Sequence, residues 1–204
     1  MAAPLQFADI AFPATGDPLP LDHGYPLFSA LSKRVATLHE QPKWGVHPVF
    51  GSRNGRRLDL NPRSLVKIRM PLSKISAVMV LAGTSIQVSG SKIALGFPRV
   101  FPLVPAAHLR ARLVTIRGFL EEESFMAALR RQLDQFEGLG QDPSSVEVAL
   151  GRRRILRIRD KKVVGFAVGL TGLGADASVA IQCSGLGGRR HMGAGLFVPP
   201  GRRG

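Results

Sequence analysis

Apolar and polar residues along the first half of the chain form a pattern that predicts helices and strands in alternation. Apolar side chains recur at helical spacing over residues 24–38, so we expect a helix there that buries one face. Pro42 lies just beyond it, and proline disfavours helix in the residue that precedes it. The other predicted elements of this half are strands 5–12, 46–50 and 65–70, a short helix 72–81, and a hairpin of strands 86–88 and 93–95.

The same order of elements recurs in the second half. Three consecutive glutamates at 121–123 predict the start of a helix, because negative charge favours the positive end of the helix dipole. Apolar residues at helical spacing follow them, and Gly138 is a typical helix stop. The remaining predicted elements are strands 109–116, 155–159, 163–170 and 195–199, and a short helix 175–182.

The second half therefore reads as strand, helix, strand, strand, helix, strand, and the first half reads the same way with one more strand at its end. That order is typical of the ferredoxin-like, or RRM-like, βαββαβ unit. We expect an α+β fold of two such units in tandem, as domains 1–102 and 103–204, joined near residues 102–108.

The sequence favours a cytoplasmic protein without a membrane partner. No stretch approaches 18 uninterrupted apolar residues, the length that a membrane-spanning helix requires. The first basic residue is Lys33, so the basic start of a signal peptide is missing. The single cysteine, Cys183, excludes a disulfide framework and a cysteine-based zinc site, and it suits a reducing compartment.

Charge is the feature of the composition that indicates a partner. The chain has 28 Lys and Arg against 14 Asp and Glu, a formal net charge of +14, and residues 60–120 and 177–204 contain no acidic side chain. Such a field attracts phosphates. A solvated basic face is the alternative, but arginine spread over three regions favours nucleic acid. With one Trp and one Tyr available for stacking, a structured RNA is favoured.

Two segments are the strongest candidates for contacting that RNA. The first is a basic run opposed only by Asp160: Arg152, Arg153, Arg154, Arg157, Arg159, Lys161 and Lys162. The second is a glycine-rich segment near the C-terminus, where glycine lets backbone amides approach a phosphate closely. Its members are Gly185, Gly187, Arg189, Arg190, His191, Gly193 and Gly195. A flexible turn is the alternative for this segment, which lies between a helix and the last strand and so does not match a dinucleotide-binding fingerprint.

The pattern GxGxxxxxGxGxF in that segment resembles the glycine-rich loop of the RAMP superfamily of CRISPR-associated proteins, and more narrowly that of the Cas-six endoribonucleases. A second match is Leu38-His39-Glu40, followed by Pro42 and Lys43. The resemblance covers nearly the whole chain. It implies a metal-independent endoribonuclease without a cofactor, which cuts CRISPR precursor RNA within each repeat. It also implies repeat RNA as the partner, with Cascade-type effector subunits as further candidate partners.

The implied reaction is attack of a 2′-hydroxyl on the adjacent phosphorus, which leaves a 2′,3′-cyclic phosphate and a 5′-hydroxyl. It needs a base, an acid and positive charge near the phosphorane. The resemblance assigns His39 and Lys43 to this site, and a histidine can act as base or acid near neutral pH. Where some relatives have a catalytic tyrosine, this chain has Ser32, and its single tyrosine, Tyr25, lies further upstream.

Several alternatives stay open. His47, and His23 with the neighbouring Asp22, compete with His39 for the catalytic role, and a lone histidine is more often structural. A zinc site from these three histidines is disfavoured by their spacing. In this interpretation domain 1–102 holds the catalytic residues and domain 103–204 the RNA-binding loop. A non-catalytic RAMP subunit that binds guide RNA is the alternative function, and a general RNA-binding or ribosome-associated protein is a third.

Overall fold

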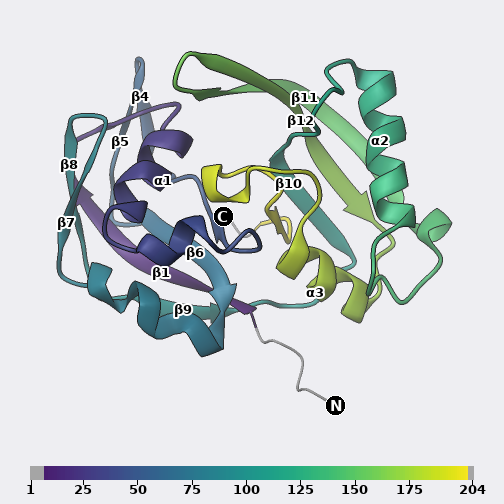
Figure 1. The fold of residues 1–204 in the computed structure, drawn as a ribbon, viewed down its shortest axis with the longest axis horizontal. Coiled ribbons are helices and arrows are strands. Elements are labelled where there is room, and N and C mark those ends of the chain that lie inside the picture. Colours follow the sequence, from purple (N-terminus) through teal and green to yellow (C-terminus); the bar gives the residue numbers. More distant parts are fainter. Residues whose placement is uncertain (1–6, 202–204) are drawn as a thin grey trace. The chain divides into compact units, whose positions relative to one another are not determined.

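The computed structural model of the chain describes residues 7–201. They form an α+β fold that divides into two compact units (Figure 1). Among the described residues, unit 1 ends at Pro102 and unit 2 begins at Leu103. Among the helices of residues 7–201, none is both long enough and apolar enough to span a membrane.

The central strand of unit 1 is β1 (Phe7–Gly16). It pairs antiparallel with β6 (Leu65–Pro71) along one edge, and with β9 (Arg99–Pro102) and β8 (Ser91–Leu95) along the other. Residues 5 and 6 of the predicted first strand lie outside the described residues. The further strands of this unit are β3 (Gly45–Val46) beside β6, β7 (Ser85–Val88) beside β8, and a small sheet of β2 (Leu19–Pro20), β5 (Arg57–Asp59) and β4 (Ser52–Asn54).

The predicted helix over 24–38 is wrong in its second part. The α-helix α1 spans Gly24–Ser32, and after a break the chain forms a 3₁₀ helix, η1, at Ala36–His39. At the break the backbone of Val35 is not helical, with φ −121° and ψ 83°. In a 3₁₀ helix positions three apart lie on one side, and the break allows both Val35 and Leu38 to be buried.

Two further predictions for unit 1 differ from the structure. Of the strand predicted over 46–50, only Val46 lies in a strand, at the end of β3, because the chain leaves β6 after His47. The helix predicted over 72–81 is present, but it is a 3₁₀ helix, η2 (Leu72–Leu81), which buries only Val78 and Leu81.

Unit 2 is a four-stranded antiparallel sheet in the order β11-β12-β10-β13. Its strands are β10 (His108–Val114), β11 (Glu147–Ile158), β12 (Lys161–Thr171) and β13 (Phe197–Val198). Its helices are α2 (Glu122–Asp134), η3 (Pro143–Ser145), α3 (Ala175–Ser184) and η4 (Arg190–Met192). The strand predicted to begin at Ile155 begins eight residues earlier, because Val148 and Leu150 continue the pairing with β12 beyond an irregularity in register.

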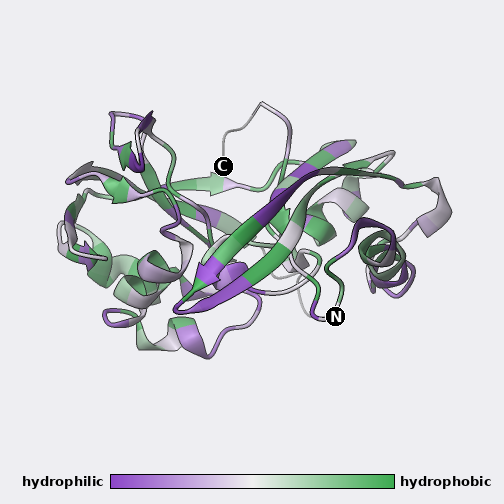
Figure 2. Cartoon of the chain, turned by 90° about the horizontal axis from the view of Figure 1, so that it is seen from above, coloured by the Kyte–Doolittle hydropathy of each residue, from purple (hydrophilic) through white to green (hydrophobic). Residues whose placement is uncertain are grey.

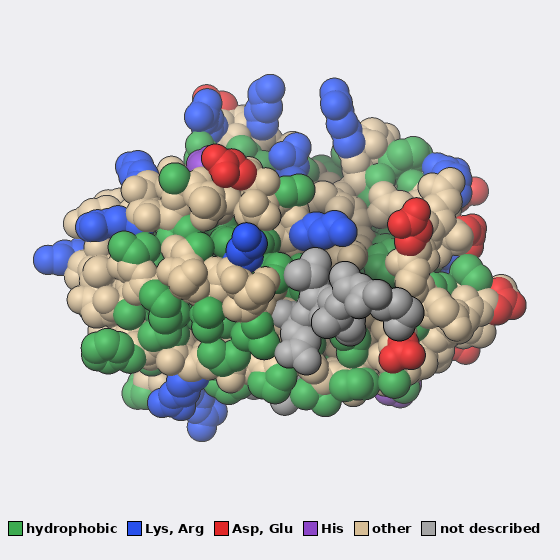
Figure 3. Space-filling view, turned by 60° about the horizontal axis from the view of Figure 1, so that its bottom comes forward, with side chains coloured by type: hydrophobic (Ala, Val, Ile, Leu, Met, Phe, Trp, Pro, Cys, Tyr) green, Lys and Arg blue, Asp and Glu red, His purple; other side chains and the backbone are tan. Residues whose placement is uncertain are grey.

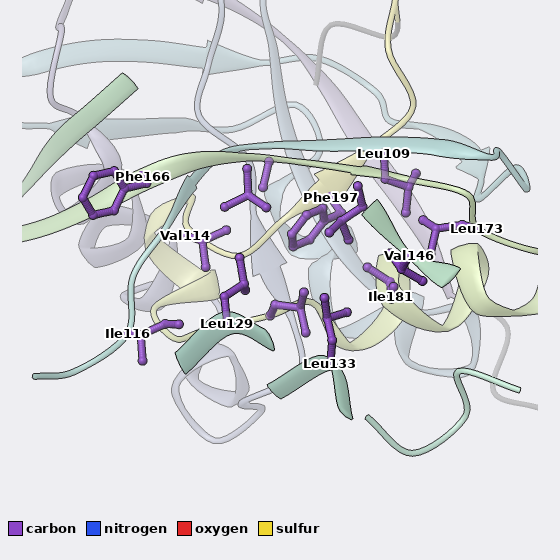
Figure 4. Close-up of a cluster of buried hydrophobic side chains, with 14 of the residues drawn as sticks. Leu109, Val114, Ile116, Leu129, Leu133, Val146, Phe166, Leu173, Ile181 and Phe197 are labelled. Atoms are coloured by element: carbon purple, nitrogen blue, oxygen red, sulfur yellow. The ribbon is translucent and has the colours of Figure 1, made fainter. Parts of the chain in front are cut away.

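The core of unit 2 forms as the hydrophobic pattern predicts. Phe125, Leu129 and Leu133 of α2 are fully buried, and the ring of Phe125 lies 4.8 Å from that of Phe166 on β12. In Figure 4, Leu129 and Leu133 belong to one buried cluster with side chains of β10, β12 and α3. Hydrophobic and hydrophilic bands follow one another along the strands (Figure 2). Burial of this apolar surface is the main force that holds the sheet to its helices.

A buried polar cluster lies on one face of the unit 1 sheet. Asp9 of β1 stands opposite Arg69 of β6, whose guanidinium donates to both carboxylate oxygens at 2.7 and 2.9 Å. His47 follows β3, and its Nε2 lies 3.2 Å from Asp9 Oδ1. Arg69 is 1% exposed and His47 is 2% exposed. The three side chains therefore satisfy one another away from water, as buried charges require.

The cluster sets the charge of its members. Burial alone would raise the pKa of the Asp9 carboxyl, but His47 and Arg69 outweigh it and hold that pKa well below its usual value. Burial lowers the pKa of His47 to about 4, against the opposing effect of Asp9. His47 is therefore neutral at physiological pH and donates its Nε2 hydrogen to Asp9.

We expect the free energy of unfolding to fall as the pH drops from about 6.5 towards 4, and the change His47→Gln to reduce this dependence. The folded-state pKa of His47 is about 4, below its ordinary value of 6.5. Between these two values His47 is protonated in the unfolded chain and neutral in the folded chain. The resulting loss reaches roughly 3 kcal/mol at the acid end. Urea denaturation at a series of pH values measures it.

The change His108→Gln is the matched control, because His108 is exposed and should keep the pH dependence of the wild type. Equal slopes of stability against pH in the wild type and in His47→Gln would contradict the assignment of the buried neutral histidine.

Candidate active site and nucleic-acid interface

His39 is the candidate histidine of unit 1 that the structure leaves exposed. His39 is the last residue of η1. The residue before it, Leu38, is fully buried and fixes the short helix to the core. An edge-on aromatic contact supports the imidazole: its ring centroid lies 4.7 Å from that of Phe28 on α1, with the planes at 67°. His39 is thus an accessible imidazole on a supported side chain, as proton transfer to or from a bound ligand requires.

Lys43 lies on the same short surface segment. The amide of Trp44 donates to the carbonyl of Gln41 at 3.0 Å, and the indole of Trp44 is 2% exposed. Buried anchors therefore stand on both sides of the segment that bears His39 and Lys43, and Lys43 itself is exposed. A histidine and an ammonium on one anchored segment suit a site for a phosphodiester.

His23 has a different environment. It caps the start of α1, is 4% exposed, and its Nδ1 lies 2.8 Å from the carbonyl oxygen of Pro20. Its Nε2 accepts a hydrogen bond from the amide of Val49 at 2.9 Å. Because Nε2 accepts, the neutral ring donates from Nδ1. Both nitrogens therefore join backbone segments, which suits a structural role.

His47 and Ser32 are also buried. His47 belongs to the Asp9–Arg69 cluster, and its lowered pKa keeps it neutral. Ser32 is 8% exposed, and its hydroxyl donates to the carbonyl of Phe28 at 2.8 Å within α1. The structure thus separates the five sequence candidates into exposed His39 and Lys43 and buried His23, Ser32 and His47.

Asp9 and Arg69 are the polar residues of unit 1 that the sequence reasoning missed. An aspartate inside the apolar run of the first strand was the available signal, because a buried carboxylate needs a cationic partner. Over residues 7–201, no three His, Cys, Asp or Glu side chains gather as ligands of a metal ion would.

The basic run of unit 2 forms the outer part of the β11–β12 hairpin. Its seven basic side chains are exposed: Arg152, Arg153, Arg154, Arg157, Arg159, Lys161 and Lys162. Arg157 and Lys162 are direct cross-strand partners, an arrangement of like charges that destabilises a sheet by itself. Lys and Arg side chains also project from the surface in Figure 3. A polyanionic ligand would relieve this repulsion.

The glycine-rich segment is densely packed. Gly185, Gly187, Gly193 and Gly195 all have positive φ, between 66° and 83°. A Cβ on Gly187 would lie 2.6 Å from the carbonyl oxygen of Thr115, and one on Gly195 would lie 2.5 Å from that of Leu186. Glycine is therefore required both by the backbone conformation and by the close approach of neighbouring chain.

Arg190 holds this loop from within. It is 6% exposed, and its guanidinium donates to the carbonyls of Cys183 at 2.7 Å and Gly195 at 3.3 Å. The expectation that Arg190 contacts RNA directly does not fit this geometry, because its charged group is used between the two ends of the loop. Arg189 is exposed and His191 is half-buried, so these two remain on the accessible side.

Comparison with known proteins agrees with this arrangement. A family profile described as Cas6 Crispr matches residues 8–202. A relative from Myxococcus xanthus, named CRISPR-associated endonuclease Cas6, is 44% identical over 196 residues, which cover 96% of this chain and 83% of the relative.

Solved structures share the fold at low sequence identity. One described as CRISPR associated protein Cas6 has a TM-score of 0.66 at 14% identity, over 95% of this chain and 99% of that chain. Another, described as a RAMP protein binding different RNA substrates, has a TM-score of 0.67 at 12% identity, over 94% and 98%. The family profile and the Myxococcus relative both span nearly the whole sequence, and the chain belongs to the Cas6 family of CRISPR-associated proteins.

Proposed function

We propose that this protein is an endoribonuclease that binds CRISPR repeat RNA and cuts it once per repeat to release the guide. The observation that carries the proposal is the exposed, Phe28-supported ring of His39 on the anchored segment that also bears Lys43. The name of the Myxococcus relative, an endonuclease, supports the reaction class. The structural neighbour that binds different RNA substrates supports RNA as the ligand.

The proposed reaction needs no metal or cofactor. The 2′-hydroxyl of one nucleotide attacks the adjacent phosphorus and loses its proton, and the 5′-oxygen of the next nucleotide leaves and gains one. His39 acts as base or acid in these transfers, and the Lys43 ammonium stabilises the negative charge that develops on the phosphorane. The products are a 2′,3′-cyclic phosphate and a 5′-hydroxyl.

Both units are proposed to be ferredoxin-like. The strand order β9-β1-β6-β3 in unit 1, with all neighbours antiparallel, supports the fourth-first-third-second arrangement of a βαββαβ unit. The order β13-β10-β12-β11 supports the same arrangement in unit 2. In this interpretation unit 1 supplies the cutting residues and unit 2 the RNA-binding hairpin and loop.

The protein is proposed to work in the cytoplasm and to stay bound to the mature guide. Cys183 is the single cysteine of the sequence and forms no disulfide within the chain, which suits a reducing compartment. Retention of the guide would make other CRISPR effector subunits of the Cascade type its further partners.

Replacing His39 by Ala is expected to slow cleavage of repeat RNA by about 10²–10⁴-fold, because one proton transfer loses its positioned group. Affinity for the RNA should stay within about twofold of the wild type. Gel analysis of end-labelled repeat RNA in EDTA measures the cleavage rate, and a filter-binding assay measures affinity.

Two comparisons make this test specific. His108→Ala, a change at an exposed histidine of unit 2, should cut normally. A single 2′-deoxy nucleotide before the cut should stop the wild type, since the attacking hydroxyl is gone. Wild-type cutting by His39→Ala would exclude His39 as the acid or base, and a wild type that binds the repeat tightly but never cuts would favour the non-catalytic RAMP subunit.

Removing positive charge from the hairpin is expected to weaken RNA binding and its dependence on salt. In the His39→Ala background, Arg154→Ala and Lys161→Ala should each reduce the slope of log affinity against log salt by about 0.7–0.9 for each phosphate that the protein no longer neutralises. Titrations of repeat RNA at several salt concentrations give this slope. Arg56→Ala, an exposed arginine of unit 1 outside the basic run, is the control, and an unchanged slope in both hairpin variants would contradict the proposed interface.

A further inference from the structure

A pocket of about 420 Å³ lies within unit 2, beside the glycine-rich loop. It is bounded by residues 115–118 and Leu120 after β10, by Gln132 of α2, by residues 162–164 of β12 and by residues 187–189 of the loop. Its volume falls in the range of pockets that bind small organic ligands. Neither the charge of the basic run nor the glycine pattern of the loop requires a cavity at this place.

The wall formed by the loop is fixed. The amide of Gly188 donates to the carbonyl of Thr115 at 2.9 Å, and the amide of Gly187 donates to Oε1 of Gln132 at 2.8 Å. A side chain on Gly187 would collide with Thr115, so this wall depends on glycine. Because Oε1 of Gln132 is engaged, its amide is oriented and its Nε2 hydrogens are the donors left for a ligand.

Positive charge surrounds the pocket. Arg117, Lys162 and Arg189 line it and are exposed, and no acidic side chain lines it. Within residues 7–201, none of these three cations forms an ion pair. The pocket therefore favours an anionic group at its rim.

The rest of the lining is aliphatic. Leu120 is 48% exposed, and Val163 and Val164 are half-buried beside it. A free phosphate would use the cations and leave this surface uncovered. A ligand with a flat, partly apolar ring and an attached phosphate would use both, together with the amide of Gln132.

We propose that this pocket binds one unpaired nucleotide of the repeat RNA, with its base against Leu120 and Val164 and its phosphate between Arg117 and Arg189. The proposal rests on RNA being the ligand of the proposed function, and it adds a specific subsite to it. Base contacts carry sequence information, whereas phosphate contacts alone do not. The pocket then selects RNAs that present an unpaired base at the matching position.

The test couples a change in the pocket to a change in the RNA. In the His39→Ala background, Leu120→Asp should weaken binding of repeat RNA about tenfold, since it removes apolar contact and adds negative charge. Val104→Asp is the matched control, because Val104 is a 39% exposed valine of the same unit outside the pocket lining, and it should bind like the background protein. Unchanged thermal melting of both variants establishes that they fold.

The RNA arm replaces each unpaired nucleotide in turn by an abasic ribose. At one position this loss should weaken binding to the background protein about as much as Leu120→Asp does, and the two changes together should cost no more than either alone. Losses that add at every position, or a Leu120→Asp variant that binds intact RNA like Val104→Asp, would overturn the proposal.

A base with an attached phosphate could belong to the repeat RNA or to a free nucleotide, and adenosine monophosphate is the probe that separates these two ligands. The proposal would be overturned if the protein bound this probe and Leu120→Asp abolished that binding without affecting RNA binding. The pocket would then be a site for free nucleotides. Cleavage by the protein with His39 intact separates the two failures: absence of cutting by the wild type defeats the proposed function, whereas normal cutting without the coupling defeats only the subsite.

Discussion

The glycine-rich loop keeps its shape because four of its positions carry no side chain and one arginine joins its ends. The positive φ angles of Gly185, Gly187 and Gly195 would strain any other residue, and their hypothetical Cβ atoms would collide with neighbouring backbone. The guanidinium of Arg190 lies within the loop and donates to the carbonyls of Cys183 and Gly195. The accessible position of Arg189 and the wall beside Thr115 both follow from this packing.

Burial assigns different chemistry to the histidines of unit 1. The ring of His47 lies where charge is costly, so it stays neutral and serves as a donor to Asp9. Both nitrogens of the His23 ring form hydrogen bonds with backbone groups. His39 is held at the surface by a buried neighbour, Leu38, and by the edge of Phe28. A proton-transfer group has to be both accessible and held in place, and among these three rings His39 meets both conditions.

Much of this could be predicted from the sequence, where local pattern and packing agree. The apolar stripe of α2 predicts the helix and its buried face, and the glycine pattern predicts the loop. The break after Ser32 could not be predicted, because helical spacing alone does not separate an α-helix from an α-helix followed by a 3₁₀ turn. The start of β11 could not be predicted, because most of its residues are exposed and its register is irregular after Leu150.

The site residues show a related limit. From the sequence, Arg190 is one more basic residue that could contact RNA. The fold shows instead that its guanidinium points inward and donates to backbone carbonyls. The partnership of Asp9 with Arg69 joins positions 60 residues apart, and its signal in the sequence is confined to one acidic residue in an apolar strand. Long-range pairs of this kind depend on strand register, which the local pattern does not determine.

The hairpin and the pocket have complementary physical roles. Exposed arginines and lysines on β11 and β12 attract any polyanion, so they supply affinity and steering that salt weakens, with little preference for sequence. A cavity with an oriented amide and aliphatic walls discriminates by shape and hydrogen bonding, and salt weakens this part less. An enzyme that cuts one phosphodiester in each repeat needs both, because charge alone would bind RNA in many registers. Lys162 belongs to both features, because it stands opposite Arg157 in the hairpin and also lines the pocket, so a phosphate bound beside it would offset the repulsion between these like charges.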